Sequence, residues 1–140
     1  MANVVVVGVD ASQSARKAAE VALDLAQSLG ASLHVVTAFE MENAETFGVG
    51  SDKVRISNAD SSEIVAKSLA GSRPGVEITH FAARGKPADS LIKEAIRLDA
   101  RVIVVGNRRM RGIGRLPGSV ANSVAHNAPC DVYIANTYDD

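Results

Sequence analysis

The sequence predicts an α/β fold built on a parallel sheet with helices on both faces. Three observations support this fold class. Short runs rich in valine and isoleucine alternate along the chain with stretches whose apolar residues recur at helical spacing. Strands that alternate with helices form right-handed crossovers, which make the strands parallel. The 140 residues contain no internal repeat, low-complexity tract or linker, so we expect residues 1–140 to form a single domain.

The chain begins with a predicted strand, a helix and a second strand. Asn3–Asp10 (NVVVVGVD) is a continuous β-branched run, which is typical of a strand buried on both faces. Asp10–Ser14 is rich in helix-capping residues, and Gly30 stands where a helix C-cap belongs. Ser32–Phe39 (SLHVVTAF) is the second strand. The apolar residues at helical spacing between the two strands are Ala15, Ala18, Ala19, Ala22, Leu23, Ala26 and Leu29.

The middle of the chain predicts a long loop and then a helix. From Glu40 to about Ile56 the apolar periodicity disappears, which is typical of a lid or a mobile segment. Asp60–Ala70 is predicted to be helical, and Gly71 and the pair Pro74–Gly75 end this helix. The side chains expected to point inward are Ile64, Val65 and Leu69.

The last part of the chain predicts three strands and two helices. Val76–Ala82 alternates in polarity like a strand, and Gly85–Pro87 makes a turn into a helix that runs to about Leu98. The side chains expected on the inner face of this helix are Leu91, Ile92, Ala95 and Ile96. The remaining elements are a strand at Arg101–Val105, a helix from Ser119 to about Asn127 and a last strand at Asp131–Ala135.

Composition and charge narrow the class of protein. Apolar residues make up 46% and charged residues 22%, which is ordinary for a soluble protein. The formal net charge of −1 argues against a broad nucleic-acid or membrane-surface role. No apolar stretch approaches the roughly 20 residues of a membrane span. Cys130 is the single cysteine, which fits a reducing cytoplasm, and the N-terminus lacks the pattern of a secretory signal, so we expect a cytoplasmic protein.

The loop after the fourth strand is a candidate ligand site. In open parallel sheets, ligands bind at the carboxyl ends of the strands, where the strand order reverses. Gly106–Val120 (GNRRMRGIGRLPGSV) carries four glycines and four arginines at such an end. Backbone N–H groups at Gly118 and Ser119, directly before a helix, suit a bound phosphate. The structural alternative is that Ser119 caps the helix, Gly118 permits the turn and the arginines are solvated.

An ordered set of motifs resembles the universal stress protein family over the whole chain. The motifs are VGVDAS (Val7–Ser12), HVV (His34–Val36), GKP (Gly85–Pro87), VIVVGN (Val102–Asn107), GSVANSV (Gly118–Val124) and APCDVYI (Ala128–Ile134). The resemblance implies a doubly wound, flavodoxin-like sheet of five parallel strands in the order 3-2-1-4-5. It also implies binding of ATP, or of cyclic AMP in some actinobacterial members. A homodimer paired through the last strand, here Asp131–Ala135, is implied as well.

The family's nucleotide-binding pattern is Gly-x-x-Gly, nine residues, and then Gly with Ser or Thr. Gly106 matches its first glycine, and Gly118–Ser119, followed by Val120, matches its closing pair. The chain departs from the pattern at two points, because Arg109 occupies the place of the second glycine and the spacer has eight residues. The guanidinium of Arg109 would either crowd the phosphates or pair with them.

The resemblance implies further contacts to the nucleotide. Asp10 matches an acidic residue near the nucleoside, although its carboxylate equally suits a cap of the following helix. The valine that contacts the base corresponds to Val35 or, if the strand end shifts by one residue, to Val36, and either equally suits the core. Gly85 lies in a loop beside the same crevice and would close over the base.

Other kinds of site find little support in the sequence. A phosphate-binding G-x-x-x-x-G-K-[ST] loop is absent, since Pro87 follows Gly85–Lys86. His34 and His80 are isolated within strands, which favours structural histidines over metal ligands. Cys130 has no neighbouring cysteine, and no nucleophile–base pair is evident.

The sequence therefore predicts a stress-response protein that binds an adenine nucleotide with little or no catalysis. The expected ligand is ATP, or a related nucleotide such as AMP or cyclic AMP, and Mg²⁺ is expected to accompany a triphosphate. Two alternatives remain. The first is a nucleotide-independent dimeric interaction protein, and the second is a weak ATPase or a binder that sequesters a cyclic nucleotide.

Overall fold

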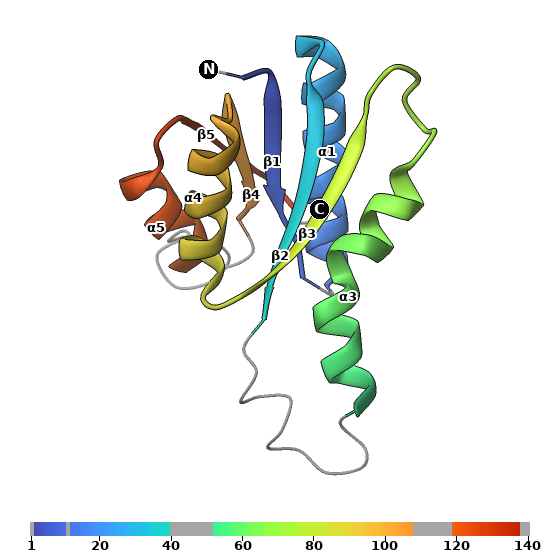
Figure 1. The fold of residues 1–140 in the computed structure, drawn as a ribbon, viewed down its shortest axis with the longest axis vertical. Helices are drawn as coiled ribbons and strands as arrows, with labels where there is room; N and C mark the ends of the chain where they lie inside the picture. The colour runs from blue at the N-terminus through green and yellow to red at the C-terminus, as the bar shows by residue number, and fades with distance from the viewer. Residues whose placement is uncertain (1, 11, 40–51, 108–118, 138–140) are drawn as a thin grey trace.

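The computed structural model describes residues 2–10, 12–39, 52–107 and 119–137, which form one sheet with helices on both sides (Figure 1). In chain order the elements are β1 (Val4–Gly8), α1 (Gln13–Leu29), β2 (Ser32–Phe39), α3 (Asp52–Leu69), β3 (Ile78–Arg84), α4 (Pro87–Leu98), β4 (Val102–Gly106), α5 (Ser119–Asn127) and β5 (Asp131–Ala135).

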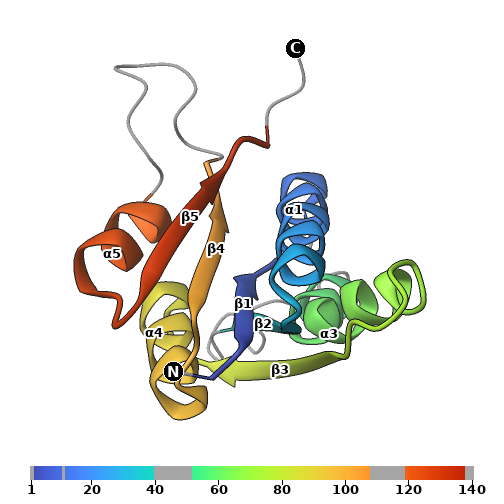
Figure 2. The same ribbon diagram turned by 90° about the horizontal axis from the view of Figure 1, so that it is seen from above.

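The sheet is parallel throughout, and its strand order is β3-β2-β1-β4-β5. This result confirms the predicted fold class and strand order. β1 lies at the centre, where Val6 is paired with His34 of β2 and with Ile103 of β4. Figure 2 shows α1 and α3 on one face of the sheet and α4 and α5 on the other. Since helices cover both faces, the side chains of β1 and β4 are apolar on both sides.

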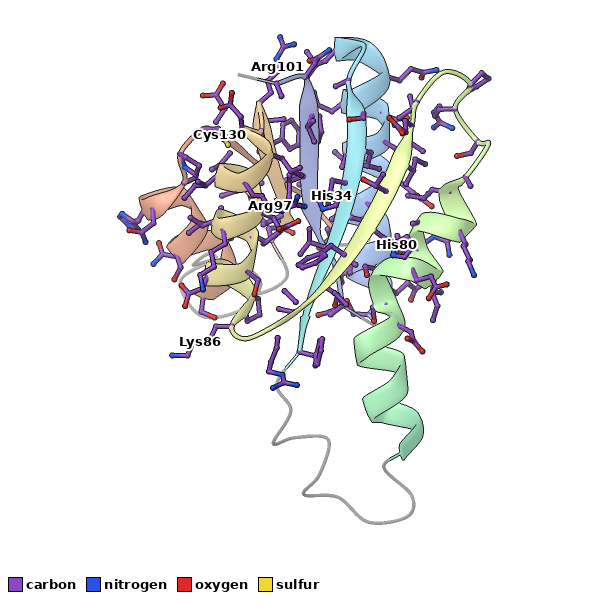
Figure 3. The ribbon with its side chains drawn as sticks, viewed as in Figure 1. His34, His80, Lys86, Arg97, Arg101 and Cys130 are labelled. Carbon is purple, nitrogen blue, oxygen red and sulfur yellow. The ribbon has the colours of Figure 1, made fainter. Side chains whose placement is uncertain are left out.

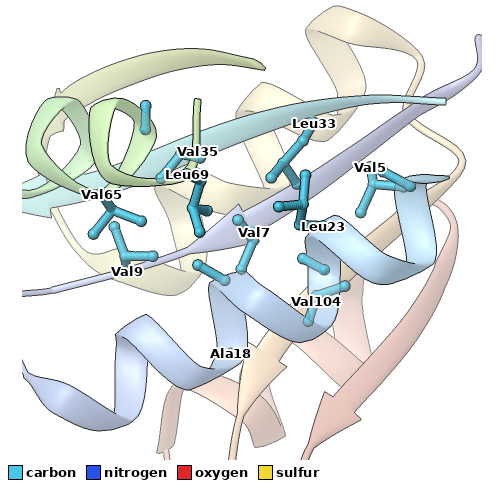
Figure 4. Close-up of a cluster of buried hydrophobic side chains, with 14 of the residues drawn as sticks. Val5, Val7, Val9, Ala18, Leu23, Leu33, Val35, Val65, Leu69 and Val104 are labelled. Carbon is cyan, nitrogen blue, oxygen red and sulfur yellow. The ribbon is translucent and has the colours of Figure 1, made fainter. Parts of the chain in front are cut away.

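α1 forms as its capping residues and alanine stripe predict. The Ser12 hydroxyl accepts a hydrogen bond from the Ala15 N–H at 3.1 Å, which caps the first turn. Gly30 ends the helix in the left-handed conformation, with φ 64°. The small alanine side chains let the helix approach the sheet closely, and Leu23 fills the space between them. Figure 4 shows this cluster, in which Leu23, Leu33 and Val7 are almost completely buried.

A second apolar cluster lies on the opposite face of the sheet. It is built around Val6, Val36 and Ile103 from the strands, with Leu91 of α4 and Val124 of α5 packed against them. Adjacent residues of one strand therefore belong to different clusters, because successive side chains of a strand point to opposite faces.

Several strands differ by one to three residues from the predicted bounds, and α3 differs most in extent. α3 begins at Asp52, so residues 52–56 are helical where the sequence indicated a loop, and residues 40–51 lie outside the described part of the chain. Residues 52–56 (DKVRI) contain only two apolar residues, Val54 and Ile56, which are too few to show a helical period. β3 starts at Ile78, and most of its side chains are exposed on both faces, because it is an edge strand.

Two isoleucines predicted to point inward are exposed. Ile64 of α3 is 56% exposed and Ile96 of α4 is 61% exposed. The buried side of α3 runs through Ser62, Val65, Ala66 and Leu69, and that of α4 through Ser90, Leu91, Glu94 and Ala95. At about 100° per residue, each isoleucine lies nearly opposite the centre of its stripe. Small and polar residues thus occupy positions that hydrophobicity alone would assign to isoleucine.

A buried polar network joins α4 to β2 and β3. His34 Nε2 donates to Glu94 Oε1 at 2.9 Å, and His34 Nδ1 is hydrogen-bonded to Thr79 Oγ1 at 2.6 Å. Arg97 donates to both carboxylate oxygens of Glu94, from Nε and Nη2, at 2.7 Å each. The Arg97 guanidinium also lies 5.9 Å from the centre of the Phe81 ring. Figure 3 labels His34 and Arg97 on the same side of the sheet.

We predict that Leu23→Ala lowers the free energy of unfolding by about 2–5 kcal/mol, because it opens a cavity in a packed core. Ile64→Ala is the matched control, since its side chain is 56% exposed, and it should change that free energy by less than about 0.5 kcal/mol. Urea denaturation of both variants measures the difference. A comparable loss at both positions would contradict the packing of α1 and α3 described above.

We predict that Glu94→Gln destabilises the fold at neutral pH by about 1.5–3 kcal/mol, because charge-assisted hydrogen bonds are lost. The Arg97 hydrogen bonds lower the pKa of Glu94 from 4.5, and His34 contributes in the same direction, whereas burial opposes the shift. The carboxylate therefore stabilises the fold above about pH 4.5, and this contribution disappears as the pH falls through the lowered pKa.

Urea denaturation at pH 7 and at pH 3 tests this dependence. The difference in stability between the unchanged chain and Glu94→Gln should narrow at the lower pH. Glu63→Gln is the control, because the Glu63–Lys67 pair lies on the surface of α3, where ion pairs contribute little. If the difference in unfolding free energy between the unchanged chain and Glu94→Gln were the same at pH 7 and pH 3, the stabilising role of the ionised Glu94 carboxylate would be refuted.

Candidate functional site

A cavity of about 330 Å³ lies at the carboxyl ends of the central strands, which point downward in Figure 1. This volume is at the lower end of the range of small-molecule sites, roughly 300–1,000 Å³. The cavity is bounded by residues from the ends of β1, β2 and β4 and from the first turns of α1, α4 and α5. The lining residues are Gly8, Val9, Asp10, Ser12, Ser14, Ala15, Val36, Ala38, Pro87, Leu91, Val105, Gly106, Ser119, Val120 and Ala121.

One side of the cavity is apolar. Val36 and Ala38 lie two residues apart on β2, so both side chains point to the face that α4 covers. Pro87 and Leu91 of α4 lie on the same side of the cavity. Because neither β2 residue is polar and α4 contributes a ring and a branched chain here, this wall suits a flat heterocycle better than a charged group.

The rest of the lining, from β1, β4 and the first turns of α1 and α5, adds hydroxyl groups and a carboxylate to apolar residues such as Val105 and Val120. Asp10 Oδ1 accepts a hydrogen bond from the Ser12 N–H at 2.8 Å, and the Ser12 hydroxyl in turn caps α1. Asp10 therefore forms the turn into the helix and also lines the cavity. Ser14 and Ser119 add hydroxyls from the first turns of α1 and α5. The first turns of these two helices bring partial positive charge to this part of the lining.

The loop after β1 is held in place by β2. The Val9 N–H donates to the Val36 carbonyl at 2.8 Å, and the Thr37 hydroxyl donates to the Val9 carbonyl at 2.9 Å. Gly8 lets Leu91 pack closely against β1, because a Cβ there would lie 2.7 Å from Leu91 Cδ1 and the leucine side chain would have to shift. The end of β1 and the N-terminal half of α4 are thus in direct contact beneath the cavity.

Gly106 has a packing role that the sequence motif did not indicate. A Cβ at this position would lie 3.1 Å from Thr137 Cγ2 and 3.7 Å from Ala18 Cβ. The next residue, Asn107, accepts hydrogen bonds from the Thr137 N–H at 2.9 Å and the Thr137 hydroxyl at 3.1 Å, and its amide donates to Asn136 Oδ1 at 3.2 Å. These bonds fix the chain at the point where it leaves β4.

The structure brings several predicted site residues together and separates others. Asp10, Val36, Gly106, Ser119 and Val120 line the cavity. The two alternatives for the base-contacting valine are now distinguished in position, because only Val36 borders the cavity.

Val35 and Gly85 lie away from the cavity lining. Val35 is completely buried in the cluster on the α1 and α3 face. The Gly85 N–H donates to the Phe39 carbonyl at 2.8 Å, which ties the turn before α4 to the end of β2. Arg109 and Gly118 lie outside the described residues.

Sequence reasoning missed part of the lining. Ser12, Ser14, Ala38, Pro87 and Leu91 were not identified as site residues, although all border the cavity. Ala38 follows from Val36 by the two-residue period of a strand, and Ser14 from its place in the first turn of α1. No sequence signal distinguishes Leu91 from an ordinary core leucine.

Neither the histidines nor the cysteine marks a second site. Within residues 2–10, 12–39, 52–107 and 119–137, no three His, Cys, Asp or Glu side chains lie close enough together to hold a metal ion. Burial raises the pKa of the Cys130 thiol, which disfavours the reactive thiolate. No described helix is both long and apolar enough to cross a membrane.

Comparison with known proteins places the chain in a family. Residues 1–136 match the model of the universal stress protein family. A universal stress protein of Thermus aquaticus is 33% identical over 138 residues, which cover 96% of this chain and 98% of the relative.

Two solved structures share the fold. A universal stress protein in complex with cAMP superposes with a TM-score of 0.74 at 28% identity and covers 98% of both chains. A universal stress protein from Archaeoglobus fulgidus in complex with dAMP has a TM-score of 0.68 at 20% identity and covers 96% of this chain and 97% of its own. The chain therefore belongs to the universal stress protein family.

Proposed function

We propose that the protein binds an adenine nucleotide in the cavity at the ends of β1, β2 and β4. The observation that carries this proposal is that the cavity lining combines an apolar surface from β2 and α4 with hydroxyls and helix N-termini from α1 and α5. The universal stress protein solved with cAMP, which is 28% identical to this chain, supports the choice of an adenine nucleotide.

These two parts of the lining suggest how the ligand is oriented. The adenine ring packs between Val36 and Ala38 of β2 and Leu91 of α4. Asp10, at the centre, accepts a hydrogen bond from a ribose hydroxyl. The phosphate lies at the first turn of α5, where Ser119 supplies a hydroxyl and the helix dipole favours negative charge. Arg109 and the other arginines of residues 108–118 are proposed to pair with further phosphates.

We propose storage or sensing of the nucleotide rather than its turnover. ATP, AMP and cyclic AMP all present the adenosine that the cavity would hold, and Mg²⁺ would accompany the triphosphate. Asp10 is the only acidic residue among the described lining residues, which include no His or Lys. Its carboxylate accepts the Ser12 N–H at 2.8 Å. A reducing cytoplasm is the proposed location, since the chain has a single cysteine.

We predict that the chain binds at least one of ATP, AMP and cyclic AMP with micromolar affinity in calorimetry. Ala38→Phe should weaken that binding at least about tenfold, because the larger side chain fills the apolar side of the cavity. Ala82→Phe is the matched control, since Ala82 is an exposed residue of β3 outside the cavity lining, and it should bind as the unchanged chain does.

If calorimetry detected no binding of ATP, AMP or cyclic AMP, the proposal would be contradicted and a nucleotide-independent interaction protein would be favoured. Phosphate release from ATP that exceeds that of a Gly118→Val variant would instead indicate a weak ATPase.

We also propose that two copies of the chain form a homodimer through β5. β5 lies at one edge of the sheet, and its side chains Tyr133 and Ile134 are 46% and 39% exposed. An exposed edge with large apolar side chains is a surface on which strands pair.

We predict that sedimentation at micromolar concentration detects a dimer, and that Ile134→Glu converts it to a monomer, because a charge would be buried in the interface. Ile96→Glu is the control, since Ile96 is exposed on α4 and should leave the dimer intact. A monomeric unchanged chain would exclude this interface.

A further inference from the structure

α4 is attached to the sheet by few large apolar side chains, the buried Leu91 and the partly buried Leu98. Its buried residues are Ser90, Leu91, Glu94 and Ala95, so Leu91 is the only large apolar one among them. On the side facing β2 and β3, contact is made instead by Glu94 and Arg97, which reach His34 and the ring of Phe81. Apolar contacts are non-directional and tolerate small slides, whereas hydrogen bonds weaken steeply when their geometry changes.

The same helix forms one wall of the cavity. Pro87 and Leu91 line the cavity, and Glu94 lies one turn further along, about 4.5 Å by the rise of a helix. Leu91 already packs tightly against the end of β1, because a Cβ on Gly8 would come within 2.7 Å of it. A rotation or slide of α4 at Glu94 therefore moves the surface that meets the ligand.

We propose that Glu94 and His34 are positioning residues for the base of the nucleotide, an inference that rests on the proposed function above. The Glu94 carboxylate accepts three hydrogen bonds, at 2.7, 2.7 and 2.9 Å, from Arg97 and His34. His34 is in turn bonded to Thr79 of β3, so the network ties α4 to two strands. It holds Pro87 and Leu91 at the separation from Val36 and Ala38 that a planar base requires.

This arrangement separates the two parts of the ligand. The network acts on the wall between β2 and α4, whereas the phosphate lies at the first turn of α5 on the other side of β1. Loss of the network should therefore weaken the binding of AMP while leaving the weaker binding of ribose 5-phosphate, which has no base, unchanged. A network that only stabilised the fold would not weaken the binding of AMP while leaving that of ribose 5-phosphate unchanged.

The decisive variant replaces both partners with apolar residues of similar size, His34→Leu with Glu94→Met. Such replacement of a buried polar pair is often neutral for stability, because no unpaired charge is left buried. The Arg97 guanidinium loses its partner but is 57% exposed to solvent. We expect the melting temperature to remain close to that of the unchanged chain and the Kd for AMP, from calorimetry, to rise about tenfold or more. The Kd for ribose 5-phosphate, measured by NMR titration, should change less than about twofold.

If the double variant does not fold, Glu94→Gln replaces it in the same experiment. Glu94→Gln should also raise the Kd for AMP relative to the Kd for ribose 5-phosphate. Glu63→Gln on α3 is the control and should leave both Kd values unchanged. Wild-type affinity for AMP in a folded network variant would overturn this inference alone. Failure of the unchanged chain to bind ATP, AMP or cyclic AMP would overturn the proposed function and this inference together, whereas failure with AMP alone would overturn this inference.

Discussion

β1 is paired on both sides and covered on both faces, and the position of the cavity depends on that constraint. Val6 is paired with His34 of β2 on one side and with Ile103 of β4 on the other. The chain leaves β1 toward α1 on one face, while α4 packs on the other face. Where connections depart in opposite directions from a parallel sheet, a crevice opens at the strand ends. The first turns of α1, α4 and α5 surround it.

This constraint explains why the cavity lining has two chemically different parts. β2 and α4 meet on one face, and at the cavity they supply the apolar side chains of Val36 and Leu91. The β1 and β4 ends meet helix N-termini, whose first N–H groups need acceptors and whose capping residues are hydroxyls or carboxylates. Asp10 and Ser12 are such residues, and their hydrogen bonds shape the turn as well as the cavity. One set of contacts therefore serves both the fold and the site.

Much of this arrangement could be predicted from the sequence, because apolar period and capping chemistry are local. Ser32–Phe39, Asp131–Ala135 and the α5 span Ser119–Asn127 have the predicted bounds. Gly30 ends α1 in the left-handed conformation as predicted. The buried faces of α3 and α4 were predicted less well, because Ser62 and Glu94 are buried whereas Ile64 and Ile96 are exposed. Which face of a helix is buried depends on its tertiary partners as well as on its own hydrophobicity.

The site shows the same division between local and tertiary information. Asp10, Val36 and Ser119 lie at strand ends and helix starts, which a local pattern can identify. The hydrogen bond between His34 and Glu94 joins residues 60 positions apart in the chain, and no periodicity indicates it. Gly106 matched a ligand motif, yet its contacts with Thr137 and Ala18 supply a packing reason for the glycine. Sequence patterns thus identified the location of the cavity better than they identified the residues that shape it.

In the proposed binding mode, the base of an adenine nucleotide lies between β2 and α4. Titration of methyl-labelled protein with AMP locates the base through nuclear Overhauser effects between the adenine protons and individual methyl groups. We expect contacts from the adenine H2 or H8 to the methyls of Val36 and Leu91, and none to those of Val35 on the opposite face. Contacts confined to other methyls, or no change in the Val36 and Leu91 signals at saturating AMP, would contradict this binding mode.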